Sequence, residues 1–424
     1  MIKFLLVSAF LFCFVTGAPE VKERRVFHVE TSRHPSQAET LIREGRLEEL
    51  VALHQSHGHS IAQNSAQGVN QQPLMDYTDE IYIGEIKLGT PPQTFSVGIS
   101  TGGADSWVVD AVCDASDEQN CRGQPSSGYS KRRFNISASS TFVKGTTATK
   151  WVGTTGYDAI DLAGMKFASQ GFFVAKKVSQ VFGTQPIDGI LGLGWPALSQ
   201  NKLTPPPWNM KDQMDEQTFT VFMARNQKRL DKTTAMDGGR ITFGGLDTDN
   251  CESQVDYMPN NSDMYWQFKM DDFSIGNWQA KRSYSEVILD TSTWYIGAPP
   301  EEVNYILVGT GASWDTTYQM YTLPCKGSKP DMVFKIGGIE YRVPAFEYML
   351  DYGLADGKCI LAVSGAAESM DKQTWYLGAP FMRQFCVVHD IEKARVGFAR
   401  SVNIDTTTGT SSSSSMILMV ASTL

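Results

Sequence analysis

Histidine is scarce in this sequence, and most of it lies near the amino terminus. The chain of 424 residues has six histidines, and five of them fall within the first 59 residues, so that only His389 lies beyond. A zinc centre built from several imidazoles, or a triad in which histidine activates a nucleophile, therefore has almost no donor in the body of the chain. If the N-terminal stretch is removed, chemistry in the remainder must rely on carboxylates.

An excess of basic residues, CxxC cysteine pairs and long apolar runs are also missing. The net charge is −9, and an acidic chain is a poor partner for a polyanion, so we expect no nucleic-acid ligand. Without a CxxC pair the sequence offers no zinc site of the common kind, and we expect neither a metal nor a cofactor. The apolar stretch Phe4–Val15 is shorter than the roughly 20 residues of a membrane helix, so we expect no transmembrane span.

The first residues have the composition of a secretory signal peptide. Lys3 supplies the positive charge, the apolar stretch follows it, and Val15-Thr16-Gly17 offers small residues for cleavage. We therefore expect residues 1–17 to be a signal peptide. The protein is then secreted to the extracellular space, with the lysosome as the alternative destination.

The cysteines fit an oxidising compartment. Cys13 leaves with the signal peptide, and six remain: Cys113, Cys121, Cys251, Cys325, Cys359 and Cys386. An even number favours three disulfides over zinc ligation, although the residues alone leave the pairing open. Two acceptor motifs for N-linked glycans, at Asn135 and Asn260, agree with the same compartment.

Both ends of the chain differ in composition from its body. Residues 18–70 are rich in arginine and carry leucine and isoleucine at helical spacing, so we expect a basic, prosegment-like region. Its histidine-rich stretch, residues 54–59, is interpreted as a connector and not as a metal cluster. Residues 403–424 are rich in serine and threonine and end in a short apolar run. That run is marginal against the ~10–20 residues of a lipid-anchor signal, so we expect a disordered tail open to O-glycosylation.

The body reads as mostly β and contains an internal repeat. Short β-branched and aromatic runs alternate with turn residues, and helical patterns are few, as around Pro299–Leu307. An apolar strand runs into a turn of small residues twice, at 95–103 and at 286–293. Each copy is followed by apolar residues and a glycine, at Ile190-Leu191-Gly192 and Leu377-Gly378. This pattern predicts a duplicated body with two related β lobes.

Ordered motifs across the body resemble the pepsin-like aspartic proteases. They include Tyr82–Gln93, Asp188–Leu193, Phe243-Gly244-Gly245 and Pro380–Asp390, and together they span about residues 75–400. The resemblance implies a bilobal fold, with an N-terminal lobe at 71–245, a C-terminal lobe at 246–402 and a cleft between them. It also implies a peptide or protein ligand in that cleft, a monomer, and the signal peptide and prosegment already expected.

The resemblance also implies a disulfide pattern. The family favours pairs at Cys113–Cys121 and at Cys325–Cys359, which leaves Cys251 and Cys386 for a third bond. Trp107, another anchor of the resemblance, is expected to belong to the core and not to contact a ligand.

The family's reaction needs two facing carboxylates, each from an Asp-Thr-Gly turn, and here this sequence departs from the pattern. Like charges at close range cannot both ionise, so the pair shares one proton and activates a water. The first Asp position holds Ser100, and Ser292 stands where the second turn has glycine. Asp290 is retained, and so are the supporting residues Thr101, Gly102 and Thr291. A serine hydroxyl cannot share a proton with Asp290 or act as its base.

Nearby residues offer no clear replacement. The resemblance points Asp105 and Asp110 away from the site, and His389 lies in a C-terminal strand outside the cleft, so Ser100 has no base to become a nucleophile. The flap hairpin of the family carries a tyrosine, whereas residues 144–150 have none. Trp151 is the nearby aromatic residue, and we consider it as the candidate to replace that tyrosine.

Three functions compete on these grounds. The first is a secreted homologue that has lost catalysis and binds a peptide or protein in the cleft. The second is an active acid endopeptidase with an unusual site, and the third is an inhibitory or structural scaffold. The serine at position 100 favours the inactive homologue over the active endopeptidase. Digestion of denatured globin at low pH by the purified protein distinguishes the two by experiment.

Overall fold

The computed structural model describes most of the body and parts of the N-terminal region. The described residues are 25–35, 41–47, 49, 80–123, 128–145, 151–224, 236–280, 285–354, 356–365 and 374–402. The expected signal peptide, histidine-rich connector and C-terminal tail lie outside them. No helix among the described residues is long and apolar enough to cross a membrane.

The first half of the chain is built from strands with a few short helices. Its strands are β1 (Phe27–Pro35), β2 (Glu80–Leu88), β3 (Gln93–Ser100), β4 (Trp107–Val109), β5 (Val143–Lys144), β6 (Gly153–Leu162), β7 (Met165–Ala175), β8 (Gly189–Gly192), β9 (Thr218–Met223) and β10 (Met236–Phe243). Its helices are α3 (Glu118–Arg122), α4 (Gln180–Thr184), α5 (Pro206–Met210) and the 3₁₀ turns η1 (Ala115–Asp117), η3 (Ile136–Ala138), η4 (Pro196–Leu198) and η5 (Lys211–Gln213).

The second half has the same character. Its strands are β11 (Asp256–Pro259), β12 (Gln267–Met270), β13 (Asp272–Ile275), β14 (Trp278–Gln279), β15 (Ser285–Leu289), β16 (Ile296–Ala298), β17 (Ser313–Asp315), β18 (Met320–Pro324), β19 (Met332–Ile336), β20 (Ile339–Val343), β21 (Met349–Leu350), β22 (Lys358–Leu361), β23 (Val363–Gly365), β24 (Thr374–Leu377), β25 (Phe385–Asp390) and β26 (Arg395–Arg400). Its helices are α6 (Pro300–Thr310), α7 (Ala345–Tyr348) and α8 (Ala379–Met382).

Local chemistry explains α6, the longest helix in the described part of the chain. Pro300 opens α6, where its fixed φ suits the first turn and its missing N–H removes no bond. Gly311 ends the helix with φ of 73°, and its N–H donates to the carbonyl of Leu307. The sequence predicted a helix around Pro299–Leu307, and α6 confirms it.

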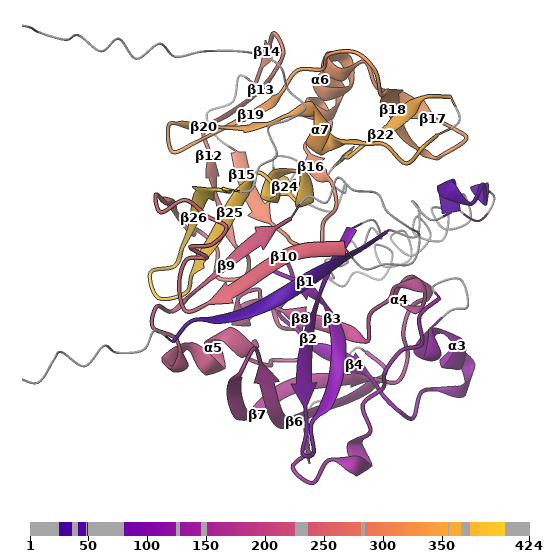
Figure 1. Cartoon of the computed structure of the whole chain (residues 1–424), viewed down its shortest axis with the longest axis vertical. Coiled ribbons are helices and arrows are strands. Elements are labelled where there is room, and N and C mark those ends of the chain that lie inside the picture. Colours follow the sequence, from indigo (N-terminus) through magenta and orange to yellow (C-terminus); the bar gives the residue numbers. More distant parts are fainter. Residues whose placement is uncertain are drawn as a thin grey trace, which may run out of the picture.

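The strands form two lobes that share one large sheet. A 13-stranded sheet runs in the order β11-β26-β25-β9-β10-β1-β2-β3-β8-β4-β7-β6-β5, and smaller sheets complete the second lobe. Figure 1 shows the elements of the first lobe below, those from β13 to β22 above, and β1, β9 and β10 crossing between them. The expected mostly β, bilobal pepsin-like fold is confirmed.

The internal repeat appears as the same strand arrangement in both lobes. β3 pairs in parallel with β8 and β4 pairs antiparallel to β8, while β15, β24 and β16 repeat this pattern. The glycine that ends each apolar run lies against the turn of its own lobe. A Cβ on Gly192 would meet the carbonyl carbon of Ala104 at 2.6 Å, and one on Gly378 would meet the oxygen of Thr293 at 2.0 Å. Glycine is needed at both positions because the backbones approach so closely.

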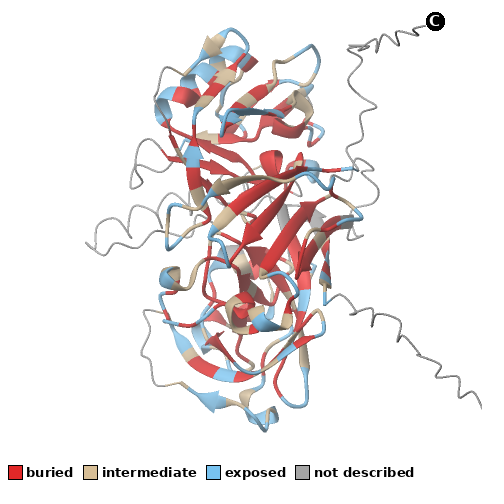
Figure 2. Cartoon of the chain, turned by 90° about the vertical axis from the view of Figure 1, so that its left-hand side faces the viewer, coloured by how far each residue is buried: buried red, intermediate tan, exposed pale blue. Residues whose placement is uncertain are grey.

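The core runs through both lobes without a break. One cluster of buried side chains extends from Val29 and Tyr82 to Trp375 and Phe398. Figure 2 shows the buried residues concentrated in the strands at the middle of the molecule. Both sides of the lobe interface therefore rest on tightly packed strands.

The cysteines pair as the resemblance implied. The structure has disulfides Cys113–Cys121, Cys251–Cys386 and Cys325–Cys359, with Cα separations of 6.3, 5.9 and 5.0 Å respectively. The second bond joins β25 to the chain ahead of β11, whereas the other two close local loops.

Candidate active site between the lobes

The two repeated turns face each other and are joined by a reciprocal set of hydrogen bonds. The backbone N–H of Thr101 donates to Thr291 Oγ1 at 3.0 Å, and the N–H of Thr291 donates to Thr101 Oγ1 at 3.1 Å. Each hydroxyl in turn donates to a carbonyl across the interface, Thr291 to Ile99 at 2.8 Å and Thr101 to Leu289 at 3.3 Å. Both threonines are buried, so these bonds fix the two turns against each other.

Asp290 is the carboxylate at the centre of this arrangement. Its Oδ1 accepts from the N–H of Ser292 at 2.9 Å, from Ser292 Oγ at 2.7 Å and from the N–H of Gly102 at 3.2 Å. Its Oδ2 accepts from Thr293 Oγ1 at 2.9 Å. A carboxylate offers about four lone-pair sites, so the open acceptor capacity of Asp290 lies on Oδ2.

Ser100 takes the position equivalent to Asp290 in the other turn. It is 3% exposed, and its Oγ lies 3.3 Å from Ser292 Oγ. In the second turn, the N–H of Ser292 donates to the carboxylate of Asp290, two residues earlier in the chain. In the first turn, the residue two positions before Gly102 is Ser100, which has no carboxylate. The N–H of Gly102 instead donates across the interface to Asp290. One acid thus receives backbone donors from both turns.

The first turn also lacks the hydroxyl group that Thr293 provides in the second turn. Gly103 occupies the place of Thr293, whose hydroxyl bonds Asp290. Gly102 must be glycine for a separate reason: a Cβ there would lie 2.5 Å from Asp290 Cγ. A carboxylate at position 100 would therefore find the backbone donor but no hydroxyl from the next residue.

Two tyrosines, Tyr265 and Tyr376, lie within range of the charge of Asp290, and neither was predicted from the sequence as a site residue. Burial, and to a smaller extent the charge of Asp290, raises the pKa of Tyr265 to about 12. The pKa of Tyr376 is raised by burial first, then by Tyr265 and Asp290. Both phenols therefore stay protonated and can donate hydrogen bonds. The pairing of β24 with β15 places Tyr376 opposite Ile288, two residues before Asp290, and no local sequence pattern announces this.

The other acids that were considered are engaged elsewhere. Asp105 accepts from Ser199 Oγ at 2.7 Å and from the backbone and side chain of Asn201 at 3.3 and 3.1 Å. Asp110 Oδ1 accepts from the N–H of Val112 at 2.8 Å. Both acids are held in local networks of the first lobe.

The aromatic residues and histidine considered for the site pack into the core. Trp107 meets the ring of Phe182 edge-on at 5.0 Å, and Trp151 meets Phe173 at 5.3 Å. His389 is fully buried in β25 and stacks on Phe219 at 4.4 Å. The flap residues 146–150 lie outside the described residues.

In the part of the chain that the structure describes, two sets of side chains have residue types and spacing suited to a metal ion. Each set is an aspartate with two cysteines, at Cys113, Asp117 and Cys121 and at Cys325, Asp351 and Cys359. The cysteines of each set are bonded to each other. These sulfurs are therefore not thiolate ligands.

Known proteins match this chain along most of its length. The family described as Eukaryotic aspartyl protease matches residues 81–401. Aspartic protease 1 of Caenorhabditis elegans is 40% identical over 389 residues, which cover 89% of this chain and 95% of that protein. Aspartic protease 17 of the same species is 38% identical with the same coverage, and Pepsin A of Suncus murinus is 30% identical over 88% of this chain and 95% of that protein. Fold, site and similarity together place this chain in the pepsin-like family of eukaryotic aspartyl proteases.

Proposed function

We propose that this protein is a secreted aspartic-protease homologue that has lost peptide hydrolysis and binds a peptide or protein between its lobes. The observation that carries the proposal is the hydroxyl of Ser100 at the position equivalent to Asp290. The reaction of the family needs two carboxylates that share one proton. A hydroxyl neither takes that proton nor serves as the second acid.

The hydrogen bonds of Asp290 support the same proposal. Three donors occupy its Oδ1, and one of them is the side chain of Ser292, which a glycine would not supply. A base that activates water must have a free lone pair directed at that water. Only Oδ2 keeps such capacity, and the bond from Thr293 already uses part of it.

A peptide ligand follows from family membership, since aspartic proteases act on peptides. The reciprocal threonine bonds keep the two turns in place, so the surface between the lobes survives the loss of one acid. Tyr265 and Tyr376 add hydrogen-bond donors beside Asp290. We expect a monomer in which the N-terminal lobe, 71–245, and the C-terminal lobe, 246–402, enclose the ligand.

Passage through the secretory pathway is consistent with the disulfides and the pepsin-like relatives. We propose secretion to the extracellular space, with lysosomal delivery as the alternative. Asn135 is exposed and suited to a glycan. Asn260 is half-buried and its side chain accepts from Gln267 N–H at 2.8 Å, so a glycan there has less room.

The alternative is an active acid endopeptidase in which Asp290 and a water suffice. The names of the relatives, which include Aspartic protease 1 and Pepsin A, favour it. The third possibility, a scaffold whose cleft has no ligand, differs from both in binding nothing there.

Two assays on the purified protein separate these functions. The first follows a fluorogenic peptide at acid pH with and without a statine-type inhibitor, using Asp290→Asn as the control. The second measures binding of the same statine-type peptide by calorimetry. We expect binding without turnover. Inhibitor-sensitive turnover that Asp290→Asn abolishes would establish an enzyme, and absence of both signals would favour the scaffold.

A further inference from the structure

We propose that the N-terminal segment, residues 25–35 and 41–47, is a permanent part of the folded protein and not a removable prosegment. The inference rests on the proposed loss of catalysis, because a chain without hydrolytic activity cannot cut itself. The contacts of the segment with the body supply the independent argument.

The first contact is a backbone ladder in the middle of the large sheet. β1 lies between β10 and β2, with seven residue pairs to β10, from Phe27 to Arg33, and four to β2, from Ser32 to Pro35. Loss of β1 would leave both neighbours with unpaired edges in the region where the lobes meet. Figure 1 shows β1 crossing the molecule next to β10.

The second contact is close packing that the body accommodates with glycine. Val29 is buried in the main core cluster. A Cβ on Gly84 would lie 2.7 Å from Val29 Cγ1, and one on Gly244 would lie 2.4 Å from the carbonyl oxygen of Arg25. The body therefore has space at these positions that the N-terminal segment fills.

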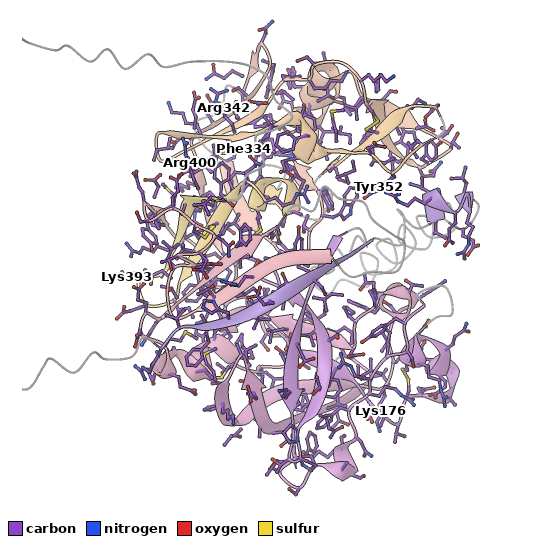
Figure 3. All side chains as sticks on the ribbon, viewed as in Figure 1. Lys176, Phe334, Arg342, Tyr352, Lys393 and Arg400 are labelled. Atoms are coloured by element: carbon purple, nitrogen blue, oxygen red, sulfur yellow. A yellow bond between two sulfur atoms is a disulfide. The ribbon has the colours of Figure 1, made fainter. Side chains whose placement is uncertain are left out.

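The third contact is an apolar plug beside the active-site turn. Leu41 and Ile42 are buried in a cluster with Trp294, Tyr295, Tyr318, Met320, Leu350, Tyr352, Leu354, Ile360 and Ala362. Trp294 and Tyr295 follow directly after the turn that carries Asp290. Tyr352, labelled in Figure 3, belongs to the second lobe. Removal of the plug would expose this aromatic surface to water.

Two ion pairs join described side chains of the segment to the body, and both lie near the surface. Arg25 pairs with Asp215 at 3.2 Å and Glu30 pairs with Arg240 at 2.6 Å, and both pairs are partly exposed. Such pairs are weak, and Arg46 pairs with Glu44 and Glu49, both also in the N-terminal region. His28 Nδ1 lies 2.9 Å from the uncharged Thr242 Oγ1. Protonation of Asp215 and Glu30 at low pH therefore removes two weak pairs, while the backbone ladder and the apolar plug do not depend on them.

The test uses the full chain with a site for a specific protease inserted within residues 50–79. After cleavage there, size-exclusion chromatography at pH 7 and pH 3 with intact-mass detection shows whether the fragment stays bound. We expect co-elution at both pH values. Release of the fragment from a body that remains folded by circular dichroism would overturn the inference.

Matched variants connect the result with the plug. Leu41→Asp with Ile42→Asp should weaken retention of the fragment at least tenfold, whereas Glu44→Gln on the exposed side should not change it. Equal retention in both variants would overturn the role of the plug.

A further experiment, on the uncut wild type at pH 3, separates the proposed function from the proposed permanent segment. Self-trimming that Asp290→Asn abolishes would refute the proposed function, while release without any hydrolysis would refute only the permanent segment.

Discussion

At the scale of single residues, donors that could serve two acids converge on one. The N–H groups of Gly102 and Ser292 both reach Asp290 Oδ1, and the Ser292 hydroxyl adds a third bond. Ser292 also lies between Asp290 and Ser100, with its Oγ 3.3 Å from Ser100 Oγ. Ser100 and Ser292, which depart from the family pattern, are therefore coupled. Restoring an aspartate at position 100 leaves the Ser292 side chain between the two acids.

We expect Ser100→Asp alone to give weak or no peptidase activity, and Ser100→Asp with Ser292→Gly to give at least ten times more. The single variant restores a carboxylate, but Ser292 still occupies the space and the acceptor between the two acids. Removing one member of a catalytic unit can reduce the rate by ~10⁶, so we expect the wild type to give almost no signal. Even a small restored peptidase activity is then measurable above this background. A fluorogenic peptide at acid pH is the assay, and Asp290→Asn in the double variant is the control. Activity of the single variant equal to that of the double would contradict the role given to Ser292.

We expect Thr101→Val to destabilise the protein by about 1–3 kcal/mol, because it leaves the buried N–H of Thr291 without its acceptor. The carbonyl of Leu289 loses a donor in the same change. Urea unfolding measures the effect, and Thr317→Val at an exposed position is the control. The double variant with Thr291→Val should show a non-additive loss, since the two hydroxyls act as one unit; a strictly additive result would argue against the reciprocal arrangement.

At the scale of elements, the sequence predicted what depends on local pattern and repetition. Nearby residues suffice to predict the strand-turn copies around Ser100 and Asp290 and the helix after Pro299. The insertion of β1 between β2 and β10 is not, because pairing partners more than 200 residues apart leave no periodic signal. The same holds for Tyr376, which the pairing of β24 with β15 brings close to Asp290 from a distant position in the chain.

We expect loss of the Cys251–Cys386 disulfide to destabilise the protein more than loss of Cys113–Cys121. The first closes a separation of 135 residues and the second one of 8. Closing a longer loop removes more entropy from the unfolded chain, and a native disulfide of a secreted domain typically contributes ~2–5 kcal/mol. Paired Cys→Ala variants compared by thermal unfolding check this. A larger loss from the short loop would indicate that native-state packing outweighs loop entropy here.

At the scale of the whole molecule, one sheet joins both lobes, and the imidazole of His389 is buried inside it. β9 and β25 are neighbours in the large sheet, and His389 in β25 lies opposite Phe219 in β9. The ring stacks on Phe219 at 4.4 Å and meets Trp266 edge-on at 4.9 Å. Burial, partly opposed by the backbone carbonyls of Phe219 and Val387, lowers the pKa of His389 to about 3. The junction between the lobes therefore accepts this ring in its neutral form.

We expect this histidine to reduce stability as the pH falls. The folded pKa lies below the unfolded value of 6.5, so the stabilising effect of the neutral ring is complete above pH 6.5 and is lost as the pH falls through the folded pKa. At pH 4 the gap of 2.5 pH units below 6.5 corresponds to roughly 3 kcal/mol. His389→Phe removes the titration and keeps an aromatic ring against Phe219. The urea midpoint should therefore decrease more between pH 7 and pH 4 for the wild type than for the variant. This comparison holds whatever the variant's stability at pH 7. Since carboxylate titration is common to both proteins, the difference isolates the imidazole, and equal losses would show that His389 takes up its proton without disturbing the sheet.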